Sequence, residues 1–240
     1  MASTILLTRP APQSLAYAQT LEDMFRDRIR CVTSPLLEIA PTGAAPKLDG
    51  VQAVLFTSAN GVRTLSKLNT IKPAIPCFCV GDKTAMEARA LGCEAFSAKG
   101  GADELVQLAS TILTPAGGPI LYIRGKMATG DIAQKLTSQG FSVDEHIIYE
   151  QVPLTLTDLA RDLFEKEKID ILPLFSPMTA KLLADEITNH PEWRLDNIDA
   201  ICLSANVRNQ VNGLAFRSLS TVETPTADAM SSAIAGLLRQ

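Results

Sequence analysis

The stretch FTSANGVR, Phe56 to Arg63, follows directly after the apolar run VQAVL, Val51 to Leu55. A short apolar run that ends in small polar residues and continues with helical periodicity predicts a buried strand, a turn and a helix. LPLFSPMTAK, Leu172 to Lys181, repeats this pattern further along the chain. The two stretches therefore predict βα units of parallel sheets that are buried on both faces.

The chain repeats its pattern once, in the same order. The matching segments are ILLTR (5–9) with ILYIR (120–124), VLFTS (54–58) with LPLFS (172–176), CVGDKTA (79–85) with CLSANVR (202–208), and ADEL (102–105) with ADAM (227–230). Their separation grows only from 115 to 125 residues. This period is far too long for a solenoid and is close to the size of a small domain. The sequence therefore predicts two similar α/β lobes.

Two long extended segments, Arg30 to Pro41 and Val143 to Thr155, carry charges and a proline. A fully buried central strand resists such residues, so we interpret both segments as crossings between the lobes. The expected fold is two parallel-sheet α/β lobes joined by a two-stranded hinge, with the second lobe inserted in the first. Residues 1–36 and 154–240 are expected to form the first lobe, and residues 37–153 the second.

The composition excludes several classes of protein. The chain has 240 residues, of which 46% are hydrophobic, and 22 basic against 26 acidic residues leave a net charge of −4. This balance argues against a nucleic-acid partner or a strongly membrane-seeking surface. The first residues, MASTILLTRP, lack the basic and long apolar regions of a secretion signal, and no segment approaches the roughly 20 apolar residues of a membrane span. We expect a cytoplasmic monomer.

The cysteines and histidines suggest no metal or redox site. The five cysteines are an odd number, and reduced thiols are the default in the cytoplasm. Cys77 and Cys79 stand two apart, so in a strand both point to the same face, and this spacing is not that of a usual zinc pair. His146 and His190 form no HExxH motif.

The turns after the strands are the candidate ligand site. In parallel α/β sheets a ligand binds beyond the carboxyl ends of the strands, where the next helices present unpaired backbone N–H groups. Thr57 or Ser58 can cap one such helix, Ser176 before Pro177 can cap another, and Thr84 opens a third. Helix capping alone would explain any single one of these residues.

Basic residues follow the same strand ends. They are Arg9, Arg63, Lys83, Arg124, Lys126, Lys181 and Arg208. A solvated helix surface would explain some of them, but together with the helix amides they predict a polyanionic ligand. Neither GDKT nor RGKM has the spacing and residues of a phosphate-binding loop, and there is no GxGxxG. ATP and NAD are therefore not the expected ligands.

The chain resembles the uroporphyrinogen III synthase family almost from end to end. The resemblance lies in TRP (8–10), FTSANGV (56–62), VGDKTA (80–85), GADELV (101–106), IRGKMATGDIAQKLTSQGFSVDEHIIYEQV (123–152) and LFSP (174–177). Each motif is loose by itself, and their order, spacing and duplication carry the resemblance. It implies two α/β lobes joined by a two-stranded ladder, and a substrate, the linear tetrapyrrole hydroxymethylbilane, whose acetate and propionate arms present many carboxylates.

The resemblance also implies a reaction. The terminal hydroxyl of hydroxymethylbilane leaves, the substituted carbon of the last pyrrole attacks, and a spiro intermediate fragments and recloses with that ring inverted, giving uroporphyrinogen III without a metal or organic cofactor. In water the same substrate closes without inversion. The implied enzyme is a cyclising hydro-lyase of heme and tetrapyrrole biosynthesis. Hydroxymethylbilane synthase is a possible transient partner that hands over the substrate.

The site residues are carried over from the resemblance. Tyr149 in IIYEQV matches the family's tyrosine at the hinge strand, and we expect it to donate a proton or a hydrogen bond to the leaving hydroxyl; an aromatic that only packs the hinge is the alternative. The expected substrate-binding residues are Arg9, Ser58, Asn60, Thr84, Arg124 and Ser176. Arg9 could equally tie the end of its strand to its own lobe.

Some residues depart from the family pattern. Ser204 and Val207 stand where Gly and Thr are frequent, and Lys126 and Met127 stand in a turn where glycines are common. Other classes are also compatible with parts of the sequence. A two-lobed anion-binding or sensory protein without catalysis would show similar strand ends but is usually exported. Paired receiver-like or flavodoxin-like domains lack support, because Thr8 and Arg9 replace the expected acidic cluster.

Overall fold

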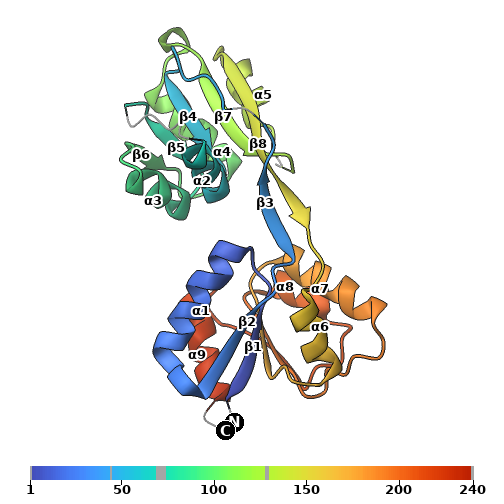
Figure 1. Ribbon diagram of the computed structural model, residues 1–240. Coiled ribbons are helices and arrows are strands. Elements are labelled where there is room, and N and C mark those ends of the chain that lie inside the picture. The colour runs from blue at the N-terminus through green and yellow to red at the C-terminus, as the bar shows by residue number, and fades with distance from the viewer. Residues whose placement is uncertain (1, 44, 69–73, 128–129, 239–240) are drawn as a thin grey trace. The chain divides into compact units, whose positions relative to one another are not determined.

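The computed structural model describes residues 2–43, 45–68, 74–127 and 130–238 (Figure 1). The chain divides into two compact units, which are described separately. Unit 1 comprises Met1–Glu38 and Val152–Gln240, and unit 2 comprises Ile39–Gln151. Unit 2 is thus inserted into unit 1.

Unit 1 contains a parallel sheet of five strands in the order β11-β10-β9-β1-β2. The strands are β1 (Ser3–Leu7), β2 (Ile29–Thr33), β9 (Ile171–Leu174), β10 (Asp199–Cys202) and β11 (Ser218–Thr221). The helices are α1 (Ala11–Phe25), α6 (Asp158–Glu165), α7 (Pro177–Asn189), α8 (Ala205–Val211) and α9 (Ala227–Leu237), with a short 3-10 turn η1 (Arg26–Arg28).

Helices cover both faces of this sheet. Ile5 and Leu7 of β1 pack with α1 and α9, while Leu6 between them packs on the opposite face with α6, α7 and α8. This alternation explains why the strands read as continuous apolar runs. Figure 1 shows α1 and α9 side by side although they come from opposite ends of the sequence, and the Tyr17 hydroxyl lies 3.0 Å from Ser231 Oγ between them.

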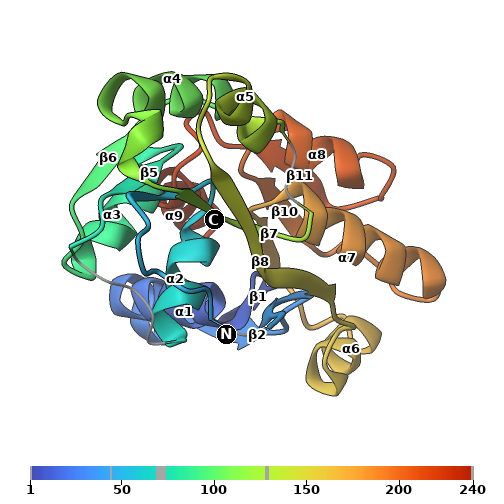
Figure 2. The same ribbon diagram turned by 90° about the horizontal axis from the view of Figure 1, so that it is seen from above.

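Unit 2 contains a sheet of six strands in the order β3-β8-β7-β4-β5-β6. The strands are β3 (Leu37–Pro41), β4 (Ala53–Phe56), β5 (Cys77–Cys79), β6 (Ala95–Ser97), β7 (Ile120–Gly125) and β8 (Val143–Pro153). The helices are α2 (Ala59–Lys67), α3 (Asp82–Ala90), α4 (Ala102–Ile112) and α5 (Ile132–Ser138), with a 3-10 turn η2 (Pro115–Gly117). Figure 2 shows α4 and α5 apart from α2 and α3, and these pairs pack on opposite faces.

The two units repeat one arrangement of strands. Strands β6-β5-β4-β7-β8 of unit 2 correspond in sequence to β11-β10-β9-β1-β2 of unit 1, and their spatial order is the same. Helices that follow corresponding strands also cover corresponding faces: α2 and α3 match α7 and α8, while α4 and α5 match α9 and α1. The prediction of two similar parallel-sheet α/β lobes is confirmed. The order along the chain differs, because β1 comes first in unit 1 whereas β7 follows β6 in unit 2.

The chain passes between the units within β3 and β8, which are neighbours in the sheet. Thr42 N donates to Ile148 O and Leu154 N donates to Leu36 O, both at 2.9 Å. Because the residue number rises on one strand as it falls on the other, the two strands run antiparallel. The single extended segment expected over Arg30 to Pro41 is in fact two strands, β2 and β3, which are separated by residues 34–36 with a bend at Leu36.

Local sequence signals set the helix ends. Gly92 and Gly140 follow the C-caps of α3 and α5 with φ of 81° and 91°, as expected for helix stops. Ser58 and Ser176 cap α2 and α7 through their hydroxyls. Thr84 does not open α3 as expected, because the N-cap is Gly81 and Thr84 lies inside the first turn. In the described residues no helix has both the length and the apolar character needed to cross a membrane.

Candidate active site

The strand order in each sheet identifies where a ligand can bind. In unit 1 the order changes direction between β1 and β9, and in unit 2 between β7 and β4. Ligands of open parallel sheets bind outside the carboxyl ends of the strands at such switch points. Arg9 and Ser176 come after β1 and β9, while Arg124 is the second-last residue of β7 and Ser58 comes after β4. Four of the predicted site residues therefore occupy equivalent places in the two units.

In unit 1, Arg9 lies against an aromatic side chain. Its guanidinium carbon is 4.2 Å from the ring centroid of Phe175, and the ring of Tyr17 meets Phe175 edge-on at 4.9 Å. A guanidinium over a ring face gains a cation–π attraction, so Arg9 is held beside Ser176. The sequence did not single out Phe175, because its role depends on β1 and β9 being neighbours.

The hydroxyls beside Arg9 have protein partners. Ser176 Oγ accepts a hydrogen bond from Thr179 N at 3.2 Å and lies 2.8 Å from Thr179 Oγ1. Burial raises the pKa of Tyr17 to about 12, although its hydrogen bond with Ser231 and the charge of Arg9 act in the opposite direction. Tyr17 therefore stays un-ionised at neutral pH.

In unit 2, the polar turn after β4 is organised by Ser58. Its Oγ accepts from Asn60 N at 3.2 Å, so Asn60 lies in the first turn of α2 with a half-buried side chain. Thr84 is 7% exposed, near the start of α3 after the neighbouring strand β5. Ser58 and Asn60 thus lie at the switch point itself, and Thr84 lies one strand further out.

Most of the basic residues predicted at the strand ends are paired within the protein. Arg124 Nε donates to Glu145 Oε2 at 2.5 Å and Lys126 Nζ lies 2.8 Å from Glu150 Oε2. The other pairs are Arg63 with Glu87, and Lys181 with Asp185. In the described part of the chain, neither Lys83 nor Arg208 has a carboxylate partner. A bound carboxylate would therefore have to compete with Glu145 for Arg124.

Tyr149 lies in β8, next to the end of β7. Its side chain is 7% exposed and belongs to the apolar cluster beneath α2 and α3. Among the described residues, the Tyr149 hydroxyl has no hydrogen-bond partner. This oxygen is also absent from the fully buried polar atoms that lack a partner there. Within the described part of the chain, the ring is thus held by packing. Ala128 and Thr129, in the segment that carries the resemblance, lie outside the described residues.

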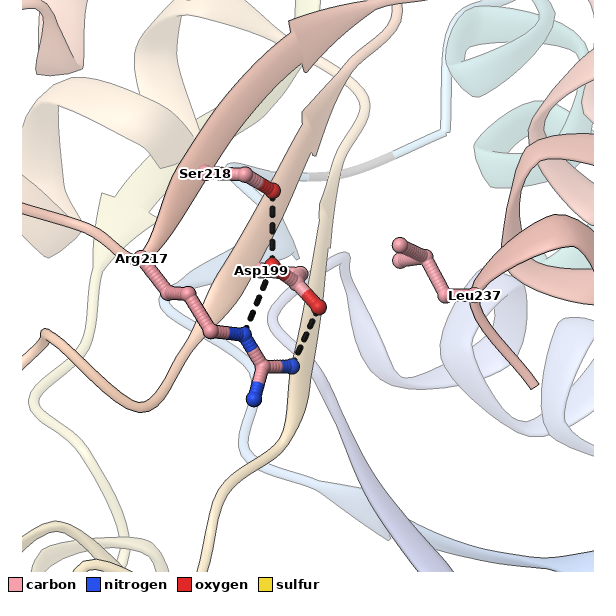
Figure 3. A pocket seen from close by; sticks show the side chains of 4 residues that line it. All are labelled: Asp199, Arg217, Ser218 and Leu237. Atoms are coloured by element: carbon pink, nitrogen blue, oxygen red, sulfur yellow. Dashed lines mark hydrogen bonds and ion pairs between the residues drawn. The ribbon is translucent and has the colours of Figure 1, made fainter. Parts of the chain in front are cut away.

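A hollow of about 580 Å³ in unit 1 does not coincide with these residues. It is lined by Asp199, Arg217, Ser218 and Leu237 (Figure 3). Asp199 and Ser218 are the first residues of β10 and β11, so the hollow lies at the amino ends of the strands. Its polar groups bind one another, because Arg217 and Ser218 donate to the Asp199 carboxylate. Among the described residues no three His, Cys, Asp or Glu side chains gather as possible metal ligands.

These features define an α/β protein of two repeated units, each with capped helix starts and a cation at the switch point of its sheet. A family model described as "Uroporphyrinogen-III synthase HemD" matches residues 17–232. A uroporphyrinogen-III synthase of Chlorobaculum parvum is 28% identical over 193 residues, which cover 74% of this chain and 76% of that protein.

Solved structures agree with this match at the level of the fold. The uroporphyrinogen-III synthetase of Helicobacter pylori has a TM-score of 0.63 at 17% identity, over 99% of this chain and 100% of the other. A mutant uroporphyrinogen III synthase of Thermus thermophilus has a TM-score of 0.53 at 14% identity, over the whole of both chains. The chain belongs to the uroporphyrinogen-III synthase family.

Proposed function

We propose that this chain is a cyclising hydro-lyase that converts hydroxymethylbilane into uroporphyrinogen III with inversion of the last ring. Membership of the family carries the proposal, since the family model spans most of the chain. It places the chain among enzymes of heme and tetrapyrrole biosynthesis that act on a small tetrapyrrole. A non-catalytic anion-binding role is not favoured.

The residues at the strand ends support binding of the carboxylate arms. Arg9 and Ser176 at one switch point, and Arg124, Ser58 and Asn60 at the other, offer cations, hydroxyls and the first amides of helices. Helix starts favour anions through oriented N–H groups and the helix dipole. Thr84 adds a hydroxyl beside the second group. Holding several arms brings the two ends of a flexible substrate together, which lowers the entropic barrier to closure.

Tyr149 is the proposed proton donor. A proton shared from its hydroxyl lets the terminal hydroxyl of the substrate depart as water, and the electron pair of the pyrrole nitrogen forms the azafulvene. The substituted carbon of the last pyrrole then attacks the azafulvene carbon. Fragmentation of the spiro intermediate, reclosure and loss of a proton give the inverted ring, and the tyrosine recovers its proton. A cytoplasmic location, a monomeric state and handover from hydroxymethylbilane synthase stay predictions.

A coupled assay tests the function. The purified chain is mixed with hydroxymethylbilane synthase and porphobilinogen, the products are oxidised, and the porphyrin isomers are separated by chromatography. We expect predominantly the type III isomer, in a proportion that rises with the amount of chain added. Formation of only the type I isomer by folded protein over a range of concentrations would refute the proposal and favour the non-catalytic binder.

A further inference from the structure

Strands β7 and β8 lose their regular register just before Tyr149. Arg124 pairs with Ile147, but Gly125 pairs with Tyr149, so β8 carries one extra residue, Ile148. Consecutive strand residues normally point to opposite faces. Ile148 and Tyr149 are nevertheless buried in the same apolar cluster. The bulge therefore turns Tyr149 toward this face, in the way that bulges re-aim side chains near functional sites.

Gly125 leaves the space that the tyrosine ring occupies. A Cβ at this position would lie 2.6 Å from Cε2 and Cζ of Tyr149 and 2.9 Å from its hydroxyl oxygen. Ordinary contact begins near 3.4 Å, so the ring would have to withdraw by about 0.8 Å. Gly125 is not among the glycines with positive φ. Space for the ring, and not an unusual backbone conformation, is therefore what requires glycine here.

The backbone around this contact is restrained, so the side chain would have to move. Lys126 N donates to Tyr149 O at 2.9 Å, directly beyond the bulge. Arg124 Nη1 donates to Gly125 O at 3.3 Å, while its Nε is held by Glu145. These hydrogen bonds hold both strands at the point where the ring meets Gly125. A side chain at position 125 would consequently change the position of the Tyr149 hydroxyl.

We propose that Gly125, together with the bulge at Ile148, positions the Tyr149 hydroxyl for the reaction. The inference rests on the proposed function, because the place of this hydroxyl matters only if it donates to the leaving group. Gly125 acts through Tyr149 and need not contact the substrate. Displacement of a reacting group by about 1 Å can cost up to about a hundredfold in rate.

The test is Gly125→Ala in the full chain. We expect kcat for type III formation to fall about tenfold to a hundredfold with little change in KM, because the hydroxyl acts on the leaving group and not on the carboxylate arms. The ring resonance of Tyr149 should also shift in NMR spectra of protein with ¹³C-labelled tyrosine. The chain has 3 tyrosines, and the spectrum of Tyr149→Phe identifies this resonance.

Gly117→Ala is the matched control. A Cβ at Gly117 would meet Gln52 Oε1 at 2.5 Å, a comparably short contact in the same unit, but it precedes the amino end of β7. This variant should keep the kcat and the Tyr149 resonance of the wild type. In a Tyr149→Phe background, Gly125→Ala should lower kcat no further, since the hydroxyl is already absent. An equally large additional loss would show that Gly125 acts in another way and would overturn the inference.

The possible failures can be distinguished. A folded Gly125→Ala variant with wild-type kcat, in an assay where the wild type makes type III product, overturns the inference and leaves the proposed function intact. Production of only type I isomer by the wild type refutes the proposed function first. If Gly125→Ala does not fold, Ile148→Val loosens the bulge without adding atoms and should lower kcat severalfold. An unchanged kcat and Tyr149 resonance in that variant would overturn the inference.

Discussion

Arg124 Nε in β7 donates to Glu145 Oε2 in the neighbouring strand β8 at 2.5 Å, and the two side chains are 23% and 42% exposed. The cation that the sequence placed at the unit 2 switch point is therefore already neutralised. If Arg124 binds a carboxylate arm, the substrate must replace Glu145. The ion pair thus reduces the free energy that Arg124 gains by binding a carboxylate arm, but it also holds the guanidinium in place.

The variants Glu145→Gln and Arg124→Ala separate these effects. Glu145→Gln should lower KM severalfold, because the guanidinium then binds the substrate without displacing a charged partner, whereas Arg124→Ala should raise it. Steady-state kinetics in the coupled assay measures both. Asp162→Asn is the control, since it breaks an ion pair between Asp162 of α6 and Lys166 at the C-cap of that helix and should leave KM unchanged. A KM that does not respond to either Arg124→Ala or Glu145→Gln would exclude Arg124 from binding.

Tyr149→Phe should fold normally but turn over much more slowly. The substitution keeps the ring that packs beneath α2 and α3 and removes only the proposed donor, and proton transfer by a positioned group typically contributes about a hundredfold or more. Single-turnover rates measure the loss. Tyr122→Phe removes a tyrosine hydroxyl on the opposite face of the same sheet, one that bonds Thr57 beside Ser58, and should lower the rate much less than Tyr149→Phe. Equal rates for Tyr149→Phe and the wild type would remove the acid role.

Ser176→Ala tests a hydroxyl at the unit 1 switch point. The loss of its cap on α7 should cost about 1 kcal/mol of stability, and KM should rise if the hydroxyl also contacts an arm. Thr226→Ala removes the same kind of cap from α9, where Thr226 Oγ1 accepts from Ala229 N at 3.1 Å. Urea unfolding and KM are compared for both. A purely structural role for Ser176 predicts matching losses of stability and no change of KM in either variant.

The pair of Asp199 and Arg217 should make stability depend on pH. Burial opposes ionisation of Asp199, but hydrogen bonds from Arg217 and Ser218 outweigh it and lower the pKa of its carboxyl. A group whose pKa is depressed by folding stabilises the protein above its unfolded pKa, about 3.9, and this contribution is lost as the pH falls through the folded pKa.

Arg217→Met should therefore cost about 1–2 kcal/mol at pH 7, and the difference from the wild type should shrink as the pH falls below 4. Arg217 is 51% exposed, which keeps the expected cost modest. Urea unfolding followed by the fluorescence of Trp193, the only tryptophan, reports on unit 1. The pair lies at the amino ends of the strands, so kcat should not change. A stability difference that is the same at pH 7 and pH 3 would contradict the ionic role of Asp199.

The sequence by itself determined the two α/β units, their duplication and the polar turns after their strands. These features are local: apolar runs, cap residues such as Ser58 and Ser176, and helix-stopping glycines such as Gly92 act through neighbours along the chain. The positions of Arg9 and Ser176 after strand ends could be predicted for the same reason. Tyr149 was found only through the family resemblance, because no local pattern distinguishes it from an aromatic that packs a core.

Only the tertiary structure decided which groups meet. Glu145, the partner of Arg124, lies in β8, and Phe175, the partner of Arg9, directly follows β9. Both contacts depend on which strands are neighbours and on their register, and neither can be read from one strand alone. The bulge at Ile148 is likewise a property of the pair β7 and β8. Side-chain periodicity along a single strand assigns Ile148 and Tyr149 to opposite faces, and the pairing with β7 brings both to the same one.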